Sequence, residues 1–319
     1  MHVPSRRILF RGLLPLLVAA SGSLLMVASG GLLMVASGSL LVAADPAPAP
    51  VTLEYRFRPD EVVVMTVAHR ARTETTISGT TQSTDTATDS RKRWRVVAVD
   101  AEGKATIEHS VDHVTMTSRT SDRGEVRWSS DGEDPPPPGY ETVRGSLGIP
   151  LSRVVIDRAG RVISRIDLQP TPPSASGDLM VVPLPDGAVE IGAEWSVPQE
   201  VAVEVPGGPR RAVRTRLRYR LESVRDDVAV ISIDTTVLTP IDDPRLESRL
   251  LERIWNGDIE FDIPSGRVIR RSTGIDRRVV GFSGQESSVR YRSTLEERLV
   301  PEETPEHGPG NAPAAPAAK

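Results

Sequence analysis

The chain has 319 residues, a formal net charge of −4 at pH 7 and no cysteine. The lack of cysteine excludes disulfides, a thiol nucleophile and a lipid-modified cysteine, and the lack of a net basic charge argues against nucleic acid as a partner. A chain of this length can bury an adequate hydrophobic core without disulfides.

The first 44 residues contain a repeated apolar octamer. LLMVASGG and LLMVASGS follow each other at 24–39, with looser copies on both sides. On a helix an eight-residue period turns each copy by roughly 80° from the last, so the copies share no face and supply only bulk hydrophobicity. Because Arg6, Arg7 and Arg11 precede the apolar run and small residues end it, residues 1–44 are predicted to be a signal peptide or an N-terminal membrane segment. Both alternatives export the rest of the chain, to the periplasm or outside the cell.

After a Pro/Ala linker at 45–50, the dominant pattern is the period-two alternation of β-strands. In VRTRLRYRL at 213–221, apolar residues alternate with arginines, which predicts one core face and one solvated face. Motifs with Asp or Ser first and Gly fourth, as at 100–103 and 157–160, predict tight hairpin turns. The expected fold class is therefore all-β and mainly antiparallel.

The predicted strands repeat as a set. RWRVVAVDAEGKATIEHSV, which begins at Arg93, aligns with RYRLESVRDDVAVISIDTT, which begins at Arg218, and this places Trp94 at the position of Tyr219. Farther along, VVIDRAGRVISRI aligns with IEFDIPSGRVIRRS around a shared Gly-Arg-Val-Ile. We therefore predict two tandem, similar β-meander halves that form a curled sheet or an open barrel.

The first half is expected at 51–168 and the second at 185–299, each with a short helix. In the second half Asp243 can cap a helix that begins at Pro244, with one apolar face formed by Leu246, Leu250, Leu251 and Ile254. A weaker counterpart lies at 141–147 in the first half.

Three segments have compositions that predict no regular structure. The polar stretch TTQSTDTATDS at 80–90 is expected to be a loop or a long hairpin tip, and 169–184 is a Pro/Ser linker. The Pro/Ala/Glu segment at 300–319 has too few apolar residues to fold and is expected to be a disordered tail.

Several stretches together resemble a known group of proteins. They are YRFRPDEVVV from Tyr55, RKRWRVVAV from Arg91, the proline run at 135–138 and RRVVGFSGQESSVRYRS from Arg277. In layout they are similar to an uncharacterised family of exported bacterial β-proteins, a domain of unknown function, over most of the chain after the N-terminal segment. The resemblance implies a β fold and export, and it supplies no catalytic motif.

The sequence contains no complete catalytic or metal-binding motif. On a strand His109 and His113 would share a face but lie about 13 Å apart, too far to hold one metal ion, and their surroundings favour a strand over a helix. The segment Gly281-Phe-Ser-Gly284 is one residue short of a nucleophile elbow. We therefore predict no catalytic residue, no metal ligand and no cofactor.

The strongest candidate site is the arginine row Arg214, Arg216, Arg218 and Arg220, on the solvated face of its strand. It could contact anionic lipid headgroups or acidic polysaccharide. The alternative is a solvated face partly paired with acids such as Glu222, which would contribute little.

The sequence thus predicts a non-enzymatic, exported β-protein, a binding or structural module of the cell envelope or the extracellular space. The alternative is a periplasmic carrier of a lipid or another hydrophobic ligand, and a carboxylate-based hydrolase is third. Expected partners are an envelope component, a lipid or a polysaccharide, and not nucleic acid. The first two hypotheses differ in whether the concave face encloses an apolar cavity or is filled by its own side chains.

Overall fold

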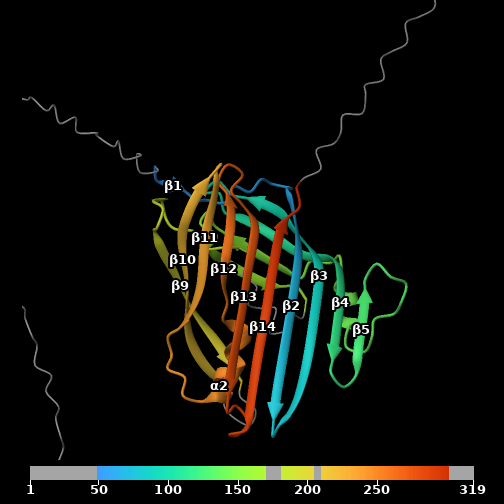
Figure 1. Ribbon diagram of the computed structural model, residues 1–319. Helices are drawn as coiled ribbons and strands as arrows, with labels where there is room; N and C mark the ends of the chain where they lie inside the picture. Colours follow the sequence, from blue (N-terminus) through green and yellow to red (C-terminus); the bar gives the residue numbers. More distant parts are fainter. Residues whose placement is uncertain (1–48, 170–180, 205–209, 302–319) are drawn as a thin grey trace, which may run out of the picture. The chain divides into compact units, whose positions relative to one another are not determined.

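The computed structural model describes residues 49–169, 181–204 and 210–301 (Figure 1). The predicted signal or membrane segment at 1–44 lies outside these residues, as do most of the linker at 169–184 and almost all of the tail at 300–319. Within the described part, neither helix is long and apolar enough to cross a membrane.

Strands make up most of the described chain. In chain order they are β1 (Val51–Thr52), β2 (Val62–Ile77), β3 (Thr80–Val99), β4 (Ala105–Thr120), β5 (Gly124–Ser129), β6 (Ser152–Ile156), β7 (Val162–Asp167), β8 (Ala188–Val189), β9 (Glu194–Val203), β10 (Arg211–Arg225), β11 (Val228–Val237), β12 (Asn256–Asp262), β13 (Arg267–Val280) and β14 (Ser287–Leu299). The helices are α1 (Glu141–Gly145) and α2 (Pro244–Leu250), and α2 runs into a 3₁₀ turn at Leu251–Arg253.

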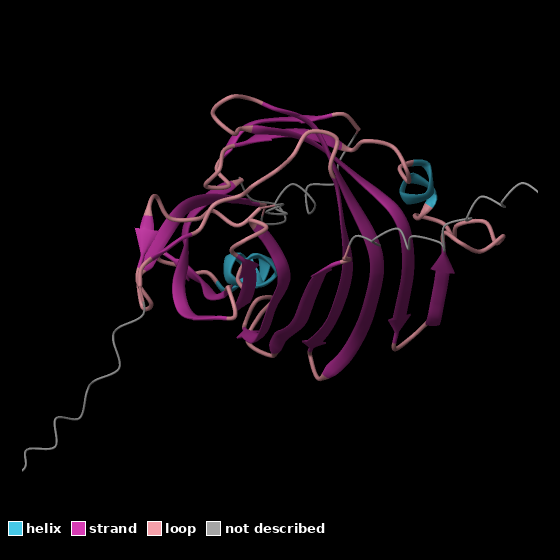
Figure 2. Ribbon diagram, turned by 90° about the horizontal axis from the view of Figure 1, so that it is seen from above, coloured by secondary structure: helices cyan, strands magenta, loops and turns pink. Residues whose placement is uncertain are grey.

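A single antiparallel sheet of 12 strands dominates the fold, with the order β7-β6-β4-β3-β2-β14-β13-β12-β11-β10-β9 and with β5 beside β4. A separate two-stranded sheet pairs β1 with β8. The large sheet curls but does not close, since β7 and β9 are its two edges (Figure 2). The predicted all-β, antiparallel, curled sheet with short helices is confirmed.

The strand order can be compared between the two predicted halves. In the first half β3, β4, β6 and β7 follow one another across the sheet, and in the second half β10, β11, β12 and β13 do the same. In sequence α1 lies before β6, and α2 lies before β12. A diverged duplication would produce this order, but the similarity of the halves stays a prediction, which a superposition of the two would test.

Two-residue turns that the sequence did not reveal close two of the hairpins. Ser78 and Gly79 join β2 to β3 with φ of 48° and 79°, and Asp226 and Asp227 join β10 to β11 with φ of 49° and 62°. Positive φ at both central residues is the type I′ geometry that fits the twist of a hairpin.

The prediction of a loop or hairpin tip at 80–90 is wrong, because these residues form the first half of β3 and pair with β2 on one side and β4 on the other. Threonine suits a strand, since its β-branched side chain packs well on a pleated surface. The aspartates of this stretch meet arginines of β2, with Arg70–Asp89 at 2.7 Å and Arg72–Asp85 at 3.3 Å.

One hydrophobic cluster joins both halves at one end of the curl. It contains buried residues of β3, β4 and β6 together with residues of β10, β11 and β12. The segment 181–184 belongs to the same cluster: Leu184 N donates to Ala159 O at 2.7 Å, and the indole of Trp195 on β9 donates to Pro183 O at 2.8 Å. These side chains fill the inside of the sheet at this end.

Helix α2 lies inside the curl and fills another part of it (Figures 1 and 2). Its cap is the predicted one, since the Asp243 carboxylate accepts a hydrogen bond from Arg245 N at 2.9 Å. A second buried cluster consists of Leu246, Leu250 and Ile254 with Val203 of β9 and Val213 of β10. The predicted helix and its apolar face are confirmed, and the face is covered by the protein's own side chains.

Candidate ligand-binding pocket

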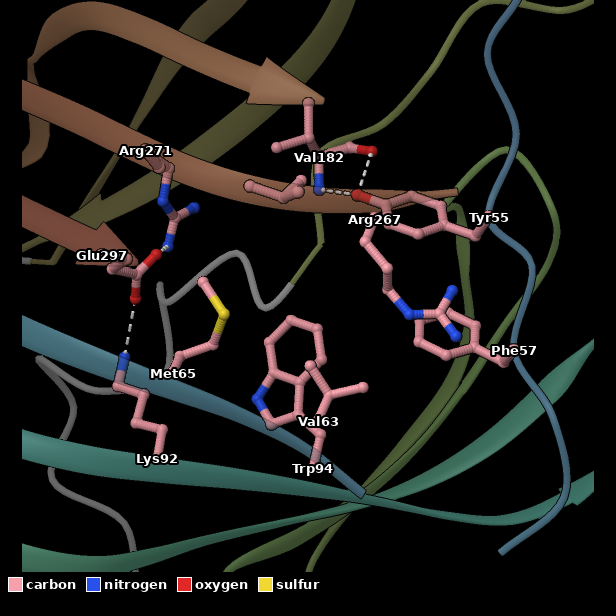
Figure 3. A pocket seen from close by; sticks show the side chains of 11 residues that line it. Tyr55, Phe57, Val63, Met65, Lys92, Trp94, Val182, Arg267, Arg271 and Glu297 are labelled. Atoms are coloured by element: carbon pink, nitrogen blue, oxygen red, sulfur yellow. Dashed lines mark hydrogen bonds and ion pairs between the residues drawn. The ribbon is translucent and has the colours of Figure 1, made fainter. Parts of the chain in front are cut away.

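Inside the curl, a pocket lies where β2, β3, β13 and β14 meet the segment at 55–57 (Figure 3). The enclosed space between its side chains is small, about 20 Å³, and the open space at the mouth is additional. The wall is largely apolar and aromatic, formed by Tyr55, Phe57, Val63, Met65, Trp94, Val182 and Val268. Four charged side chains, Lys92, Arg267, Arg271 and Glu297, complete the lining.

The strand register explains how residues distant in sequence meet here. Val63 on β2 lies opposite Trp94 on β3, and Met65 lies opposite Lys92. Because side chains alternate between the faces of a strand, Lys92 and Trp94 both point to the concave face. Arg271 and Glu297 are likewise opposite each other on β13 and β14.

A buried row of charges forms one side of the pocket. Lys92 Nζ lies 3.2 Å from Glu297 Oε1, and Arg271 pairs with the other carboxylate oxygen of Glu297 (Figure 3). The side chain of Lys92 is only 14% exposed, that of Arg271 11% and that of Glu297 9%. Burial raises the pKa of Glu297, but the charges of Arg271 and Lys92 outweigh burial and hold this pKa below its ordinary value. Glu297 is therefore ionised at neutral pH.

Arg267 is held separately, against an aromatic ring. Its guanidinium donates to Glu61 at 2.6 Å, and its Cζ lies 4.1 Å from the centroid of the Phe57 ring, a cation–π contact. The side chain of Arg267 is only 7% exposed. Its Nε has no hydrogen-bond partner within the described residues.

Tyr55 is hydrogen-bonded to the backbone of Val182, another residue of the pocket lining. Its hydroxyl donates to Val182 O at 3.1 Å and accepts from Val182 N at 2.8 Å (Figure 3). Burial raises the pKa of this hydroxyl well above its ordinary value, so that it stays protonated. Two segments far apart in sequence are thus joined beside the pocket.

The predicted arginine row lies elsewhere, on the outer face of β10, and none of its residues lines the pocket. Arg218 lies 3.9 Å from Asp234 and Arg220 lies 3.9 Å from Glu222. The register also places Arg214 opposite Glu200 of β9. Acids therefore flank the row, as the solvated-face alternative requires, and binding of an anion there stays a prediction.

The expectation that His109 and His113 share a face is wrong. His109 lies opposite Trp94 and His113 lies opposite Arg91, three positions away on β3, so the two histidines point to opposite faces. The cause is a β-bulge at Asp112, which adds one residue to β4. Among the described residues, no group of three or more His, Cys, Asp or Glu side chains is placed to hold a metal ion.

Sequence reasoning missed the pocket, although a signal was present. In KRWRVV, Lys92 alternates in phase with Trp94 and Val96, on the apolar side of the strand. Glu297 is similarly in phase with Leu295 and Leu299. A charged residue in the apolar phase of two different strands indicates a buried pair.

No protein-family model matches the chain, and no curated protein matches it. Among solved structures, the chain is similar to one that concerns lipid–protein interactions in lipovitellin, with 17% identity and a TM-score of 0.44 over 82% of this chain and 26% of that one. Our chain thus spans about a quarter of that chain.

Two other structures are less similar. DynF from the dynemicin biosynthesis pathway of Micromonospora chersina shows 8% identity and a TM-score of 0.22, over 83% of this chain and 93% of that one. A β-barrel-like protein of a domain of unknown function from Brucella abortus shows 11% identity and a TM-score of 0.17, over 76% of this chain and 98% of that one. Likeness at this level carries no argument about function, and the resemblance to a family of exported β-proteins stays a hypothesis.

Proposed function

We propose that the protein is a non-enzymatic binding protein of the cell envelope or the extracellular space, which holds a small amphipathic molecule in the pocket. The observation that supports this proposal is that an aromatic, apolar wall and buried charged side chains face the same space inside the curl. Ligand sites commonly combine a mostly apolar lining with a few placed polar groups. Export rests on the N-terminal apolar segment with its preceding arginines.

The filled regions of the curl limit the size of the ligand. One cluster joins the two halves and includes the pocket residues Tyr55 and Val182, and α2 packs on β9 and β10 in another part. Because the enclosed space between the lining side chains is only about 20 Å³, a short acyl chain that enters from the mouth fits this proposal better than a whole phospholipid. The ligand that we propose under the carrier hypothesis is therefore a small amphipathic molecule.

Binding of a neutral apolar dye tests the proposal. N-phenyl-1-naphthylamine, whose fluorescence rises in apolar surroundings, is titrated into the purified protein. We expect saturable binding that falls at least tenfold in Val268→Phe, because the larger side chain occupies the pocket. The matched control is Val280→Phe on the same strand, where the residue is 62% exposed and does not line the pocket.

Thermal melts of both variants establish that they fold. A wild-type protein that does not bind the dye would refute the proposal. Equal binding by folded Val268→Phe and Val280→Phe would place the dye outside the pocket and refute it as well.

A further inference from the structure

Two buried donors that line the pocket lack a hydrogen-bond acceptor. They are the indole Nε1 of Trp94 and the Nε of Arg267, and neither has a partner within residues 49–169, 181–204 and 210–301. Buried donors of this kind are rare, since each costs the free energy of its lost hydration. Arg267 as a whole is only 6% exposed, so bulk water does not replace the missing acceptor.

The charges around these donors favour an acceptor that is negatively charged. The pocket lining contains the cations Lys92, Arg267 and Arg271 and the carboxylate of Glu297, and Glu61 pairs with Arg267 from outside the lining, so three positive charges face two negative ones. Trp Nε1–H and guanidinium N–H groups can only donate, so an ammonium group has nothing to donate to at either atom. A hydrogen bond to an ionised acceptor is about twice as strong as one between neutral groups.

We infer that the polar end of the ligand is an oxyanion, a carboxylate or a phosphate, that accepts a hydrogen bond from Trp94 Nε1 on the side toward Lys92. The apolar part of the ligand then contacts Val63, Met65 and Val268, which line the same pocket. Figure 3 shows the indole of Trp94 beside Met65 and Val63, with its nitrogen on the side toward Lys92. This inference rests on the proposed function and adds the chemical class of the ligand.

Competition between four eight-carbon compounds tests the inference. Octanoate, octyl phosphate, octanol and octylamine each have eight carbons in an unbranched chain, and the displacement of N-phenyl-1-naphthylamine from the wild-type protein by each compound is measured at pH 7. We expect octanoate or octyl phosphate to bind about tenfold more tightly than octanol, and octylamine to bind most weakly. Comparison of the first two shows which oxyanion the pocket prefers.

Two tryptophan variants show whether the indole N–H is responsible. Trp94→Phe keeps an aromatic ring but removes the donor, so the ratio of octanoate to octanol affinity should fall several-fold. The matched control is Trp128→Phe, because the buried Trp128 already donates to Asp134 O at 3.3 Å and does not line the pocket. That control should keep the wild-type ratio.

The failures of the two proposals can be told apart. If the dye and all four eight-carbon compounds fail to bind, the proposed function is refuted. If they bind but octanol competes as well as octanoate and octyl phosphate, or if Trp94→Phe keeps the wild-type ratio, only the oxyanion inference is overturned.

Discussion

The substitution Glu297→Gln should strongly destabilise the fold. The Glu297 carboxylate is shared by Lys92 and Arg271, and all three side chains are at most 14% exposed. Removal of one partner from a buried ion pair typically costs about 3–5 kcal/mol, because a charge stays buried without its counter-charge. We expect a loss of this size in the free energy of unfolding at pH 7, measured by urea denaturation followed by circular dichroism.

The loss should depend on pH in a defined direction. The pKa of Glu297 is lowered in the folded protein from its ordinary value of 4.5, since burial raises it but Arg271 and Lys92 lower it by more. The Glu297 carboxylate therefore binds a proton more readily in the unfolded chain than in the folded protein. The stabilisation that the ionised Glu297 contributes is complete above pH 4.5 and is lost as the pH falls through the pKa of the folded state. The difference between wild type and Glu297→Gln should accordingly shrink below pH 4.5.

The neighbouring residue supplies the control. The side chain of Glu296 is 39% exposed, faces the opposite side of β14 and pairs with Arg270 and Arg298. Exposed ion pairs contribute little, so Glu296→Gln should unfold at nearly the same urea concentration as wild type. Equal midpoints for Glu297→Gln and Glu296→Gln would refute the reasoning about the buried charge row.

Three further predictions concern the packing and the N-terminus. Leu250→Ala should lower the free energy of unfolding by about 2–5 kcal/mol, because Leu250 is 1% exposed within a filled cluster. A change below about 1 kcal/mol in urea denaturation would contradict that packing. Gly266→Ala should lower the melting temperature more than Gly79→Ala. Both glycines have positive φ, but only at Gly266 would an added Cβ lie 2.6 Å from a backbone oxygen, so equal shifts would show that this close approach is absent. Intact mass of the protein from its native host should show a mature chain that begins near Asp45, whereas retention of Met1 would show that the segment is not cleaved.

The sequence correctly predicted the elements that depend on interactions between residues close together in the chain. The cap at Asp243 and the apolar spacing of Leu246 and Leu250 predicted α2, because both act within a few residues. The alternation in β10 likewise identified its buried face. The stretch at 80–90 was predicted wrongly because its polar composition was given more weight than the β-propensity of threonine and the pairing with two neighbouring strands.

The pocket could not be predicted in the same way, since its contacts span most of the chain. Lys92 and Glu297 are 205 residues apart and meet only because β14 pairs with β2, which brings the last long strand beside the first. Arg267 and Glu61 are 206 residues apart. No local pattern specifies which strands become neighbours, although charged residues in an apolar phase did mark two of the pocket residues.

A crystal structure of the protein with octanoate tests the central claim most directly. We expect electron density for the carboxylate within hydrogen-bond distance of Trp94 Nε1, with the alkyl chain against Val63, Met65 and Val268. Density only on the outer surface of the sheet, or an empty pocket at a saturating octanoate concentration, would contradict it.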